Sequence, residues 1–286
     1  MHPHKSIATL FARAAVIAAL PILVSCKSVG IPLTAGQDPD TTASTANIAS
    51  LSEVVQRNPS DPQAYNVRGS VLGRSGRNDE ALADFNKALA LDPNYAQAYA
   101  NRGLVQRQTK KFDLALADYN RAISIDPSYA VAYVGRGMVY RQQNQPTLAF
   151  ADFNKAIEIK PDTAQAYYNR GLLYQAQRQH NFAIEDFTTT LGLTRQDAEP
   201  YIARGQSHIA AGDLKAAIGD LDNAVELEPQ SLQAWTSRGL AYERTGDKEK
   251  AAGSYAQALN ISKTFEPAKQ GFARVGGQFG RTYQAF

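Results

Sequence analysis

The chain of 286 residues contains one cysteine and four histidines. A single thiol cannot form an intramolecular disulfide, and it excludes a zinc site built from several thiolates. The histidines are too scattered along the sequence for a histidine-rich metal centre: His2, His4, His180 and His208. The sequence therefore predicts no metal site and no cofactor.

The chain also lacks a marked excess of charge of either sign. It has 30 Lys and Arg against 27 Asp and Glu, and two of the basic residues, Lys5 and Arg13, lie in a segment that we expect to be removed. The remaining 28 basic and 27 acidic side chains nearly balance. A nucleic-acid partner is therefore not expected, because binding phosphates requires a concentrated basic face.

The N-terminal segment combines a positive charge with a short apolar run. Lys5 and Arg13 precede the run Ala14–Val24, which is interrupted by Pro21. This run is shorter than the roughly 20 residues that span a bilayer. The arrangement is typical of a secretory signal peptide, which we predict over residues 1–25.

The residues Leu23-Val24-Ser25-Cys26 resemble the lipobox of bacterial lipoproteins. In that class the cysteine thiol accepts diacylglycerol, a peptidase cuts just before it, and a further acyl chain is added to its amine. The resemblance implies that Cys26 is the lipidation site and that several acyl chains, such as palmitate, anchor the protein stably to a membrane. Lys27, where a retention signal has Asp, favours the outer membrane, facing the periplasm. The alternative is an unmodified cysteine after an ordinary cleaved signal.

Residues 27–45 are polar, rich in Pro, Gly and Thr, and show no periodicity. Together with Cys26 they are predicted to form a lipid anchor and flexible tether over residues 26–45. A tether of this length has a root-mean-square reach of roughly 25 Å.

A repeat of 34 residues covers most of the remaining chain, with five positions recurring in phase. An aromatic residue recurs at Tyr65, Tyr99, Tyr133, Tyr167, Tyr201 and Trp235. An arginine followed by glycine recurs at Arg68, Arg102, Arg136, Arg170, Arg204 and Arg238. Next come Ala81, Ala115, Ala149, Ala183, Ala217 and Ala251. A bulky residue follows four positions later at Phe85, Tyr119, Phe153, Phe187, Leu221 and Tyr255, and proline closes units at Pro59, Pro93, Pro127, Pro161 and Pro229.

This pattern resembles the tetratricopeptide repeat, a helix-turn-helix unit. Six units match: 62–95, 96–129, 130–163, 164–197, 198–231 and 232–265. The resemblance implies an all-α fold, a right-handed α-solenoid with a concave inner groove. The helical spacing of Tyr65, Gly69 and Leu72 agrees with it, and one helix pair cannot bury its apolar face without a stacked neighbour. The chain departs from the family pattern at Arg195 and Lys263, which replace the closing proline, and at the recurring arginine, where leucine is common.

Half-repeats are expected to cap both ends of the array. Residues 46–61 keep the phase of a second helix, and residues 266–286 hold a first-helix pattern and an aromatic tail. The tail carries Phe279, Tyr283 and Phe286. Ordering about ten residues costs roughly 1–2 kcal/mol each, which three buried aromatics barely offset. We therefore expect a mobile tail, with occupation of the groove by the tail as the alternative.

No catalytic constellation is recognisable in the sequence. It has no glycine-rich phosphate loop and no HExxH motif. His180 and His208 fall at repeat positions and are interpreted as structural substitutions. An aspartate recurs in five units by repetition, so that its presence says little about acid–base chemistry: Asp84, Asp118, Asp152, Asp186 and Asp220. We predict that the protein is not an enzyme.

The recurring aspartate and arginine are both expected on the inward sides of their helices. Partly buried opposite charges need one another, which predicts an Arg–Asp pair within each of the first five units. A rival cation lies three residues after the aspartate in units one to three only: Lys87, Arg121 and Lys155. Unit six has Ser254 in place of the aspartate, so Arg238 is expected to lack this partner.

In this family, peptides usually lie in the concave groove, lined by one face of each first helix. The phase assigns ten candidate groove residues here: Leu104, Arg107, Val131, Val134, Met138, Arg141, Tyr168, Leu172, Ile202 and Ile209. An apolar strip flanked by Arg107 and Arg141 would be formed by five of them: Val134, Met138, Tyr168, Leu172 and Ile202. Such a strip is typical of an interaction site. Packing between repeats is the alternative, mainly for Leu104, Met138 and Leu172, whereas Tyr168 and Ile202 are expected to be exposed. The positions of a carboxylate clamp are mostly apolar, which argues against a chaperone C-terminus as ligand.

These features predict a lipid-anchored periplasmic scaffold that binds envelope proteins or peptides through the groove. In architecture the chain resembles lipoproteins that hold peptidoglycan hydrolases near the outer membrane, which implies an adaptor role. Two alternatives remain: a pilotin-like assembly factor for a secretin or pilus, and a periplasmic hydrolase or transferase with an unrecognised site.

Overall fold

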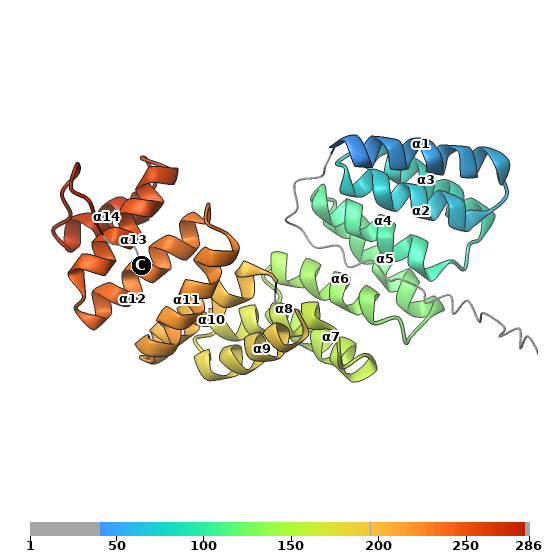
Figure 1. Cartoon of the computed structure of the whole chain (residues 1–286). Coiled ribbons are helices and arrows are strands. Elements are labelled where there is room, and N and C mark those ends of the chain that lie inside the picture. Colours follow the sequence, from blue (N-terminus) through green and yellow to red (C-terminus); the bar gives the residue numbers. More distant parts are fainter. Residues whose placement is uncertain (1–40, 195, 284–286) are drawn as a thin grey trace, which may run out of the picture. The chain divides into compact units, whose positions relative to one another are not determined.

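The computed structural model describes residues 41–194 and 196–283, with side chains from residue 47 onward. Over this part of the chain there are fourteen helices and no strand (Figure 1). Their bounds are α1 Thr41–Arg57, α2 Pro62–Arg74, α3 Asn78–Leu91, α4 Ala96–Gln108, α5 Phe112–Ile125, α6 Ala130–Gln142, α7 Pro146–Ile159, α8 Ala164–Ala176, α9 His180–Leu193, α10 Ala198–Ala211, α11 Leu214–Leu227, α12 Leu232–Thr245, α13 Lys248–Ile261 and α14 Glu266–Arg274. The predicted all-α solenoid is confirmed. None of the described helices is long and apolar enough to cross a bilayer.

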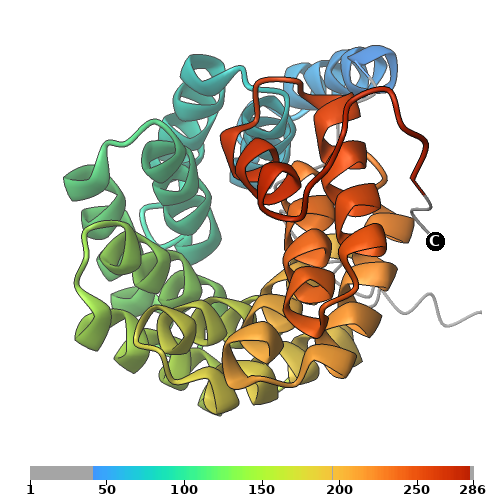
Figure 2. The ribbon, with the colours of Figure 1, turned by 90° about the vertical axis from the view of Figure 1, so that its left-hand side faces the viewer.

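The helices α2 to α13 form six consecutive pairs, and each pair stacks on the next around a curve (Figure 2). Helix α1 packs on α2 at one end of the array, and α14 packs on α13 at the other. Helix α1 begins at Thr41, so the prediction that the tether extends to residue 45 was wrong at its C-terminal end. The predicted signal peptide, Cys26 and the rest of the tether lie outside the described residues.

Small residues at fixed positions allow the two helices of a pair to approach closely. The recurring alanines of the second helices are fully buried, and so are the bulky residues four positions later. A Cβ atom at Gly137 would lie 2.7 Å from Cε1 of Phe153 in the same pair. Gly135 has a related role between pairs, because a Cβ there would overlap the ring of Tyr119 in the preceding pair. These glycines are therefore required by packing rather than by backbone conformation.

The turn between the two helices of a pair places one residue in the left-handed region. Glycine takes this position in units one, five and six, at Gly76, Gly212 and Gly246. In units two to four the residue is Lys110, Asn144 or Arg178, with φ of 59°, 57° and 59°. A side chain is strained in this conformation, although asparagine tolerates it better than other residues.

We expect Lys110→Gly to stabilise the protein. The substitution removes the steric strain of a left-handed lysine but increases the conformational freedom of the unfolded chain, which leaves a net gain of about 0.5–1 kcal/mol. Asn144→Gly is the matched control and should gain less. Thermal unfolding followed by circular dichroism measures both. A lower melting temperature for Lys110→Gly would show that the lysine side chain makes a stabilising contact that outweighs the strain.

The tail after α14 folds back on the end of the array. The ring of Phe272 in α14 lies 5.1 Å from that of Phe279 and 5.6 Å from that of Tyr283, measured between centroids. Arg281 forms an ion pair with Glu249 of α13 at 2.9 Å. The backbone N–H of Gln278 donates to the Tyr283 hydroxyl at 2.6 Å.

The prediction of a mobile tail was therefore wrong up to Tyr283. The ion pair, the hydrogen bond and the apolar surface of Phe272 add to the burial of aromatic rings in offsetting the chain entropy that ordering the tail costs. The contacts are with α13 and α14, which gives no support to occupation of the groove by this part of the tail. Phe286 lies outside the described residues.

Candidate functional site: the concave face

The first helices of the pairs lie on the inner side of the curved array. Consecutive first helices contact one another from α2 and α4 through to α12 and α14. Among the described second helices, α3 to α13, consecutive members make no such contact. The first helices are thus closer together, which is what the inner side of a curve requires. We call the surface that they form the concave face.

Each of the first five units contains the predicted Arg–Asp pair, which joins its two helices. The arginine Nε and Nη2 atoms donate to the two carboxylate oxygens of the aspartate over 2.6–2.9 Å. The bidentate pairs are Arg68–Asp84, Arg102–Asp118, Arg136–Asp152, Arg170–Asp186 and Arg204–Asp220. The aspartates are buried, and hydrogen bonding to Asp152 raises the pKa of Arg136. The rival cations do not pair with these aspartates in the described structure.

The same arginines also link neighbouring units, a role that the sequence analysis missed. The Nη1 atom of Arg136 donates to Oδ1 of Asn120 in the preceding second helix at 2.7 Å. Arg102 and Arg170 repeat this contact with Asn86 and Asn154 at 2.6 and 2.7 Å. Arg204 reaches the hydroxyl of Thr188, and Arg68 that of Ser52 in α1. The signal lay in the asparagines, which recur every 34 residues immediately after the bulky residue.

Unit six rearranges the pair rather than losing it. Arg238 faces Ser254 as predicted, and its Nη1 atom donates to the serine hydroxyl at 3.0 Å. Its Nε atom lies 2.6 Å from Oδ1 of Asp222, which stands where units one to three have asparagine. The carboxylate has thus moved from the same unit to the preceding one. Arg238 is the most buried of the six arginines.

The predicted groove residues divide into buried and accessible sets. Val134, Ile202 and Ile209 are buried, so the expectation that Ile202 is exposed was wrong. Ile202 belongs to the hydrophobic cluster that contains Val225 of its own unit and Trp235 of the next unit. The repeat phase alone cannot distinguish a residue packed between units from one that faces the open groove.

The accessible part of the concave face is centred on units two to four. Val131 is 54% exposed, whereas three apolar residues, Leu104, Met138 and Leu172, are half-buried. Tyr168 is also half-buried: its ring lies 5.8 Å from that of Phe187 and its hydroxyl 3.3 Å from Oε2 of Glu199. Burial raises the pKa of Tyr168, and the neighbouring Glu199 adds to this effect.

Arg107 and Arg141 occupy the same position in two successive first helices and differ from the arginines described above. Neither has a carboxylate within 4.0 Å among the described residues, although both are half-buried. The Nε atom of each is shielded from solvent and has no hydrogen-bond partner there. Burial lowers the pKa of Arg141, and the Arg107 guanidinium lowers it further, while Tyr168 opposes both effects. Arg107 lies beside the Tyr119 hydroxyl, whose pKa burial raises to about 12.

Polar side chains join consecutive first helices beside these residues. Asn101 donates to Oδ1 of Asn66 at 2.9 Å, and Gln175 donates to the Ser207 hydroxyl at 3.0 Å. Gln206 donates to the hydroxyl of Ser237 at 2.9 Å. Sequence reasoning missed these contacts because they depend on the register between units. They fix neighbouring first helices relative to one another and so make the concave face a defined surface.

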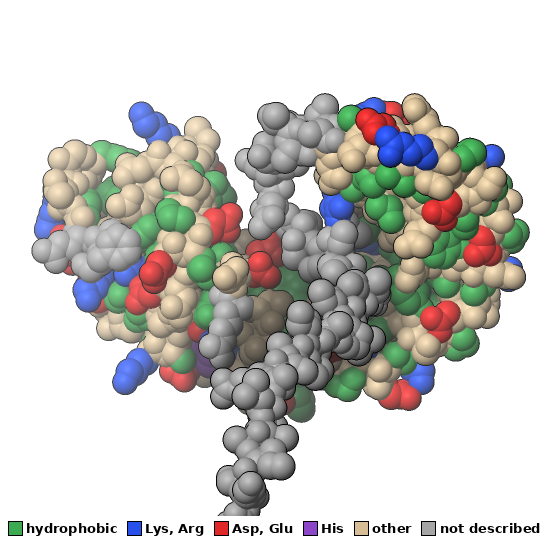
Figure 3. All heavy atoms as spheres, turned by 45° about the vertical axis from the view of Figure 1, so that its right-hand side comes forward, with side chains coloured by type: hydrophobic (Ala, Val, Ile, Leu, Met, Phe, Trp, Pro, Cys, Tyr) green, Lys and Arg blue, Asp and Glu red, His purple; other side chains and the backbone are tan. Residues whose placement is uncertain are grey.

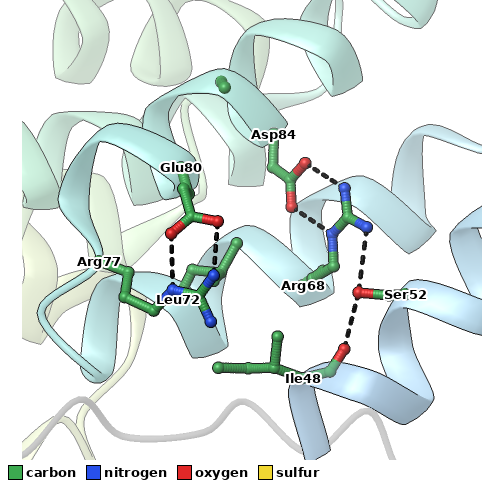
Figure 4. Close-up of a pocket in the computed structure, with 8 residues that line it drawn as sticks. Ile48, Ser52, Arg68, Leu72, Arg77, Glu80 and Asp84 are labelled. Carbon is green, nitrogen blue, oxygen red and sulfur yellow. Dashed lines mark hydrogen bonds and ion pairs between the residues drawn. The ribbon is translucent and has the colours of Figure 1, made fainter. Parts of the chain in front are cut away.

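A pocket of about 250 Å³ lies at the N-terminal end of the array, between α1, α2 and α3 (Figure 4). It contains the Arg68–Asp84 pair, with Ser52 bonded to both Arg68 and the carbonyl of Ile48. Leu72 lines it, whereas tyrosines stack on the arginine at the equivalent place in units three, four and six. Leu72 is smaller than those tyrosines and fills less of this space.

The described residues contain no group of three or more His, Cys, Asp or Glu arranged to hold a metal ion. His208 lies 3.9 Å from Asp220, which Arg204 already binds. On the face shown in Figure 3, basic and acidic side chains are interspersed with hydrophobic ones. This agrees with the near balance of charge in the sequence.

Comparison with known families identifies the fold family. The tetratricopeptide repeat family matches residues 48–96, 67–130 and 202–267, and further descriptions of the repeat match residues 137–177 and 164–197. The chain belongs to the tetratricopeptide repeat family. A comparison with curated proteins found no match.

Solved structures share this fold at low sequence identity. A structure of the APC/C hetero-tetramer Cut9–Hcn1 is 18% identical with a TM-score of 0.72, and covers 82% of this chain; the chain spans only 46% of that relative. PilF of Pseudomonas aeruginosa is 19% identical with a TM-score of 0.68, over 77% of this chain and 99% of PilF. YrrB, described as a TPR protein with an unusual peptide-binding site, is 25% identical with a TM-score of 0.56, over 65% of this chain and 96% of YrrB.

Proposed function

We propose that this tetratricopeptide repeat protein is a lipid-anchored periplasmic scaffold that binds envelope proteins through its concave face. The observation that supports binding is the accessible part of that face, where Val131 is exposed and Arg107 and Arg141 lack acidic partners. Residues of this kind are typical of interaction surfaces. The similarity to YrrB, which is described as having a peptide-binding site, also supports a peptide as ligand.

The location in the envelope rests on the sequence around Cys26. A signal peptide followed by a lipobox supports outer-membrane anchoring, and no described residue bears on it. Within this setting we propose an adaptor for peptidoglycan hydrolases. A pilotin-like role is the alternative, and the similarity to PilF supports only the shared fold. An unrecognised hydrolase or transferase would instead turn over muropeptides as purified protein without partners.

Lipidation can be tested by one substitution. Cys26→Ser removes the thiol that accepts diacylglycerol, and we expect the precursor to accumulate and labelling by a palmitate analogue to disappear. The measurement is gel mobility and fluorescence of the labelled protein in its bacterial host. Undiminished labelling of Cys26→Ser would refute the anchor.

Partner binding is tested by affinity capture from detergent-solubilised envelopes. Val131→Glu places a charge on the concave face, and Leu114→Glu is a matched control because both side chains are 54% exposed and Leu114 lies on a second helix. We expect Val131→Glu to lose the partner and Leu114→Glu to retain it. Recovery of a peptidoglycan hydrolase favours the adaptor, and recovery of a secretin favours the pilotin-like role. Equal capture by both variants would contradict binding at the concave face.

A further inference from the structure

Among the described arginines that are at least half-buried, Arg107 and Arg141 differ from the others because neither forms an ion pair. The six repeat arginines each have an aspartate, and Arg274 binds Glu243, which occupies the position of Arg107 and Arg141 in unit six. Units two and three hold a positive charge at this position, and no described carboxylate pairs with it. Unit six instead holds a negative charge there, which pairs with Arg274. The positive charge of Arg107 lowers the pKa of Arg141, so the two guanidinium groups interact unfavourably.

We propose that Arg107 and Arg141 together bind the carboxylate of an aspartate or glutamate side chain in a peptide that lies on the concave face. This inference rests on the proposed scaffold function and specifies the chemistry of its partner. A guanidinium presents a rigid fork of donors that matches a carboxylate, and shielding from water strengthens the interaction. The Nε–H group of each arginine is enclosed by the protein without a partner, which leaves the outer Nη groups as the donors for such a carboxylate.

The surroundings favour a peptide over a small inorganic anion. Leu104 and Met138 precede the two arginines by three residues, which is about one helical turn, so each apolar side chain lies on the same helix face as an arginine. Both are half-buried, and Val131 is exposed at the start of the same helix as Met138. An acidic residue flanked by aliphatic residues complements this combination of charge and apolar surface.

The test uses the full-length chain in detergent and two short probes. Acetyl-Leu-Asp-Leu-amide carries the acidic group, and acetyl-Leu-Asn-Leu-amide is its uncharged isostere. Titrations are followed by the NMR signals of the arginine Nε–H groups, which detect weak binding directly. We expect the aspartate peptide to shift the signals of Arg107 and Arg141 and to bind at least tenfold more tightly than the asparagine peptide.

The double variant Arg107→Gln/Arg141→Gln should lose this preference and bind both peptides equally. It should melt at or above the temperature of the unmodified chain, because it removes two repelling charges without breaking an ion pair. Arg178→Gln, in an exposed turn, is the control and should keep the preference. Equal binding of the two peptides by the unmodified chain, no binding of the aspartate peptide, or a preference that survives in the double variant would overturn the proposal.

Failure of this inference can be distinguished from failure of the proposed function. If the double arginine variant captures the same envelope proteins as the unmodified chain while Val131→Glu loses them, the scaffold function stands and the carboxylate site is wrong. If Val131→Glu also retains every partner, the concave face itself is not the binding surface.

Discussion

Replacing Arg136 with methionine is expected to lower the free energy of unfolding by about 3–5 kcal/mol, the cost of stranding one member of a buried ion pair. The side chain of Asp152 is only 6% exposed and would be left buried without its counter-ion. The contact from Arg136 to Asn120 of the preceding unit would be lost as well. Chemical denaturation with a common slope for variant and parent measures the change.

Arg238→Met provides the comparison and should cost less. Its carboxylate partner, Asp222, has a side chain that is 47% exposed, so water can solvate the charge that remains. Ser254 keeps a hydrogen bond to the carbonyl of Lys250. The sequence predicts that Arg238 lacks the aspartate of its own unit, and the structure adds an acidic partner, Asp222, in the preceding unit.

A double variant separates the charge effect from packing. Arg136→Met/Asp152→Leu removes both charges and should recover much of the stability lost in Arg136→Met, because apolar residues often replace a buried pair without loss. Equal losses for Arg136→Met and Arg238→Met, or no recovery in the double variant, would show that the aspartate is not left as an uncompensated buried charge.

The second large effect is expected for Ile202→Ala, at about 2–5 kcal/mol. Ile202 is 5% exposed and lies in the cluster that contains Val225 and Trp235, so truncation leaves a cavity between units five and six. The sequence led to the opposite expectation, that Ile202 is an exposed groove residue. The structure shows that Val131 is exposed instead.

Val131→Ala is the matched control for Ile202→Ala. Its side chain is 54% exposed, and exposed substitutions usually change stability by less than about 0.5 kcal/mol. Both variants are measured by thermal and denaturant unfolding. A small loss for Ile202→Ala would mean that the site collapses without a cavity or that the side chain is not packed between the units.

Much of this fold could be predicted from the sequence because its contacts occur at fixed, short separations. Arg136 and Asp152 are 16 residues apart within one helix pair, so two residues that recur together in five units indicate their contact directly. The same holds for Gly137 and Phe153. Periodicity translates into structure wherever one unit contains both partners.

Features that depend on the interface between units were predicted less well. Ile202 is buried in a cluster with Trp235, which lies one unit away. The Asp222 carboxylate was missed because it belongs to a different unit from Arg238, although it stands at the asparagine position of units one to three. The early start of α1 at Thr41 was missed because its first residues are small and polar and resemble the rest of the tether.

Site-specific photo-crosslinking in the envelope tests the central claim most directly. A benzoylphenylalanine at position 131 lies on the concave face, and the same group at position 114 has equal exposure on a second helix. We predict that irradiation joins an envelope protein to position 131 and not to position 114. Crosslinks at position 114 alone, or at both positions with equal yield, would contradict a scaffold that binds its partner through the concave face.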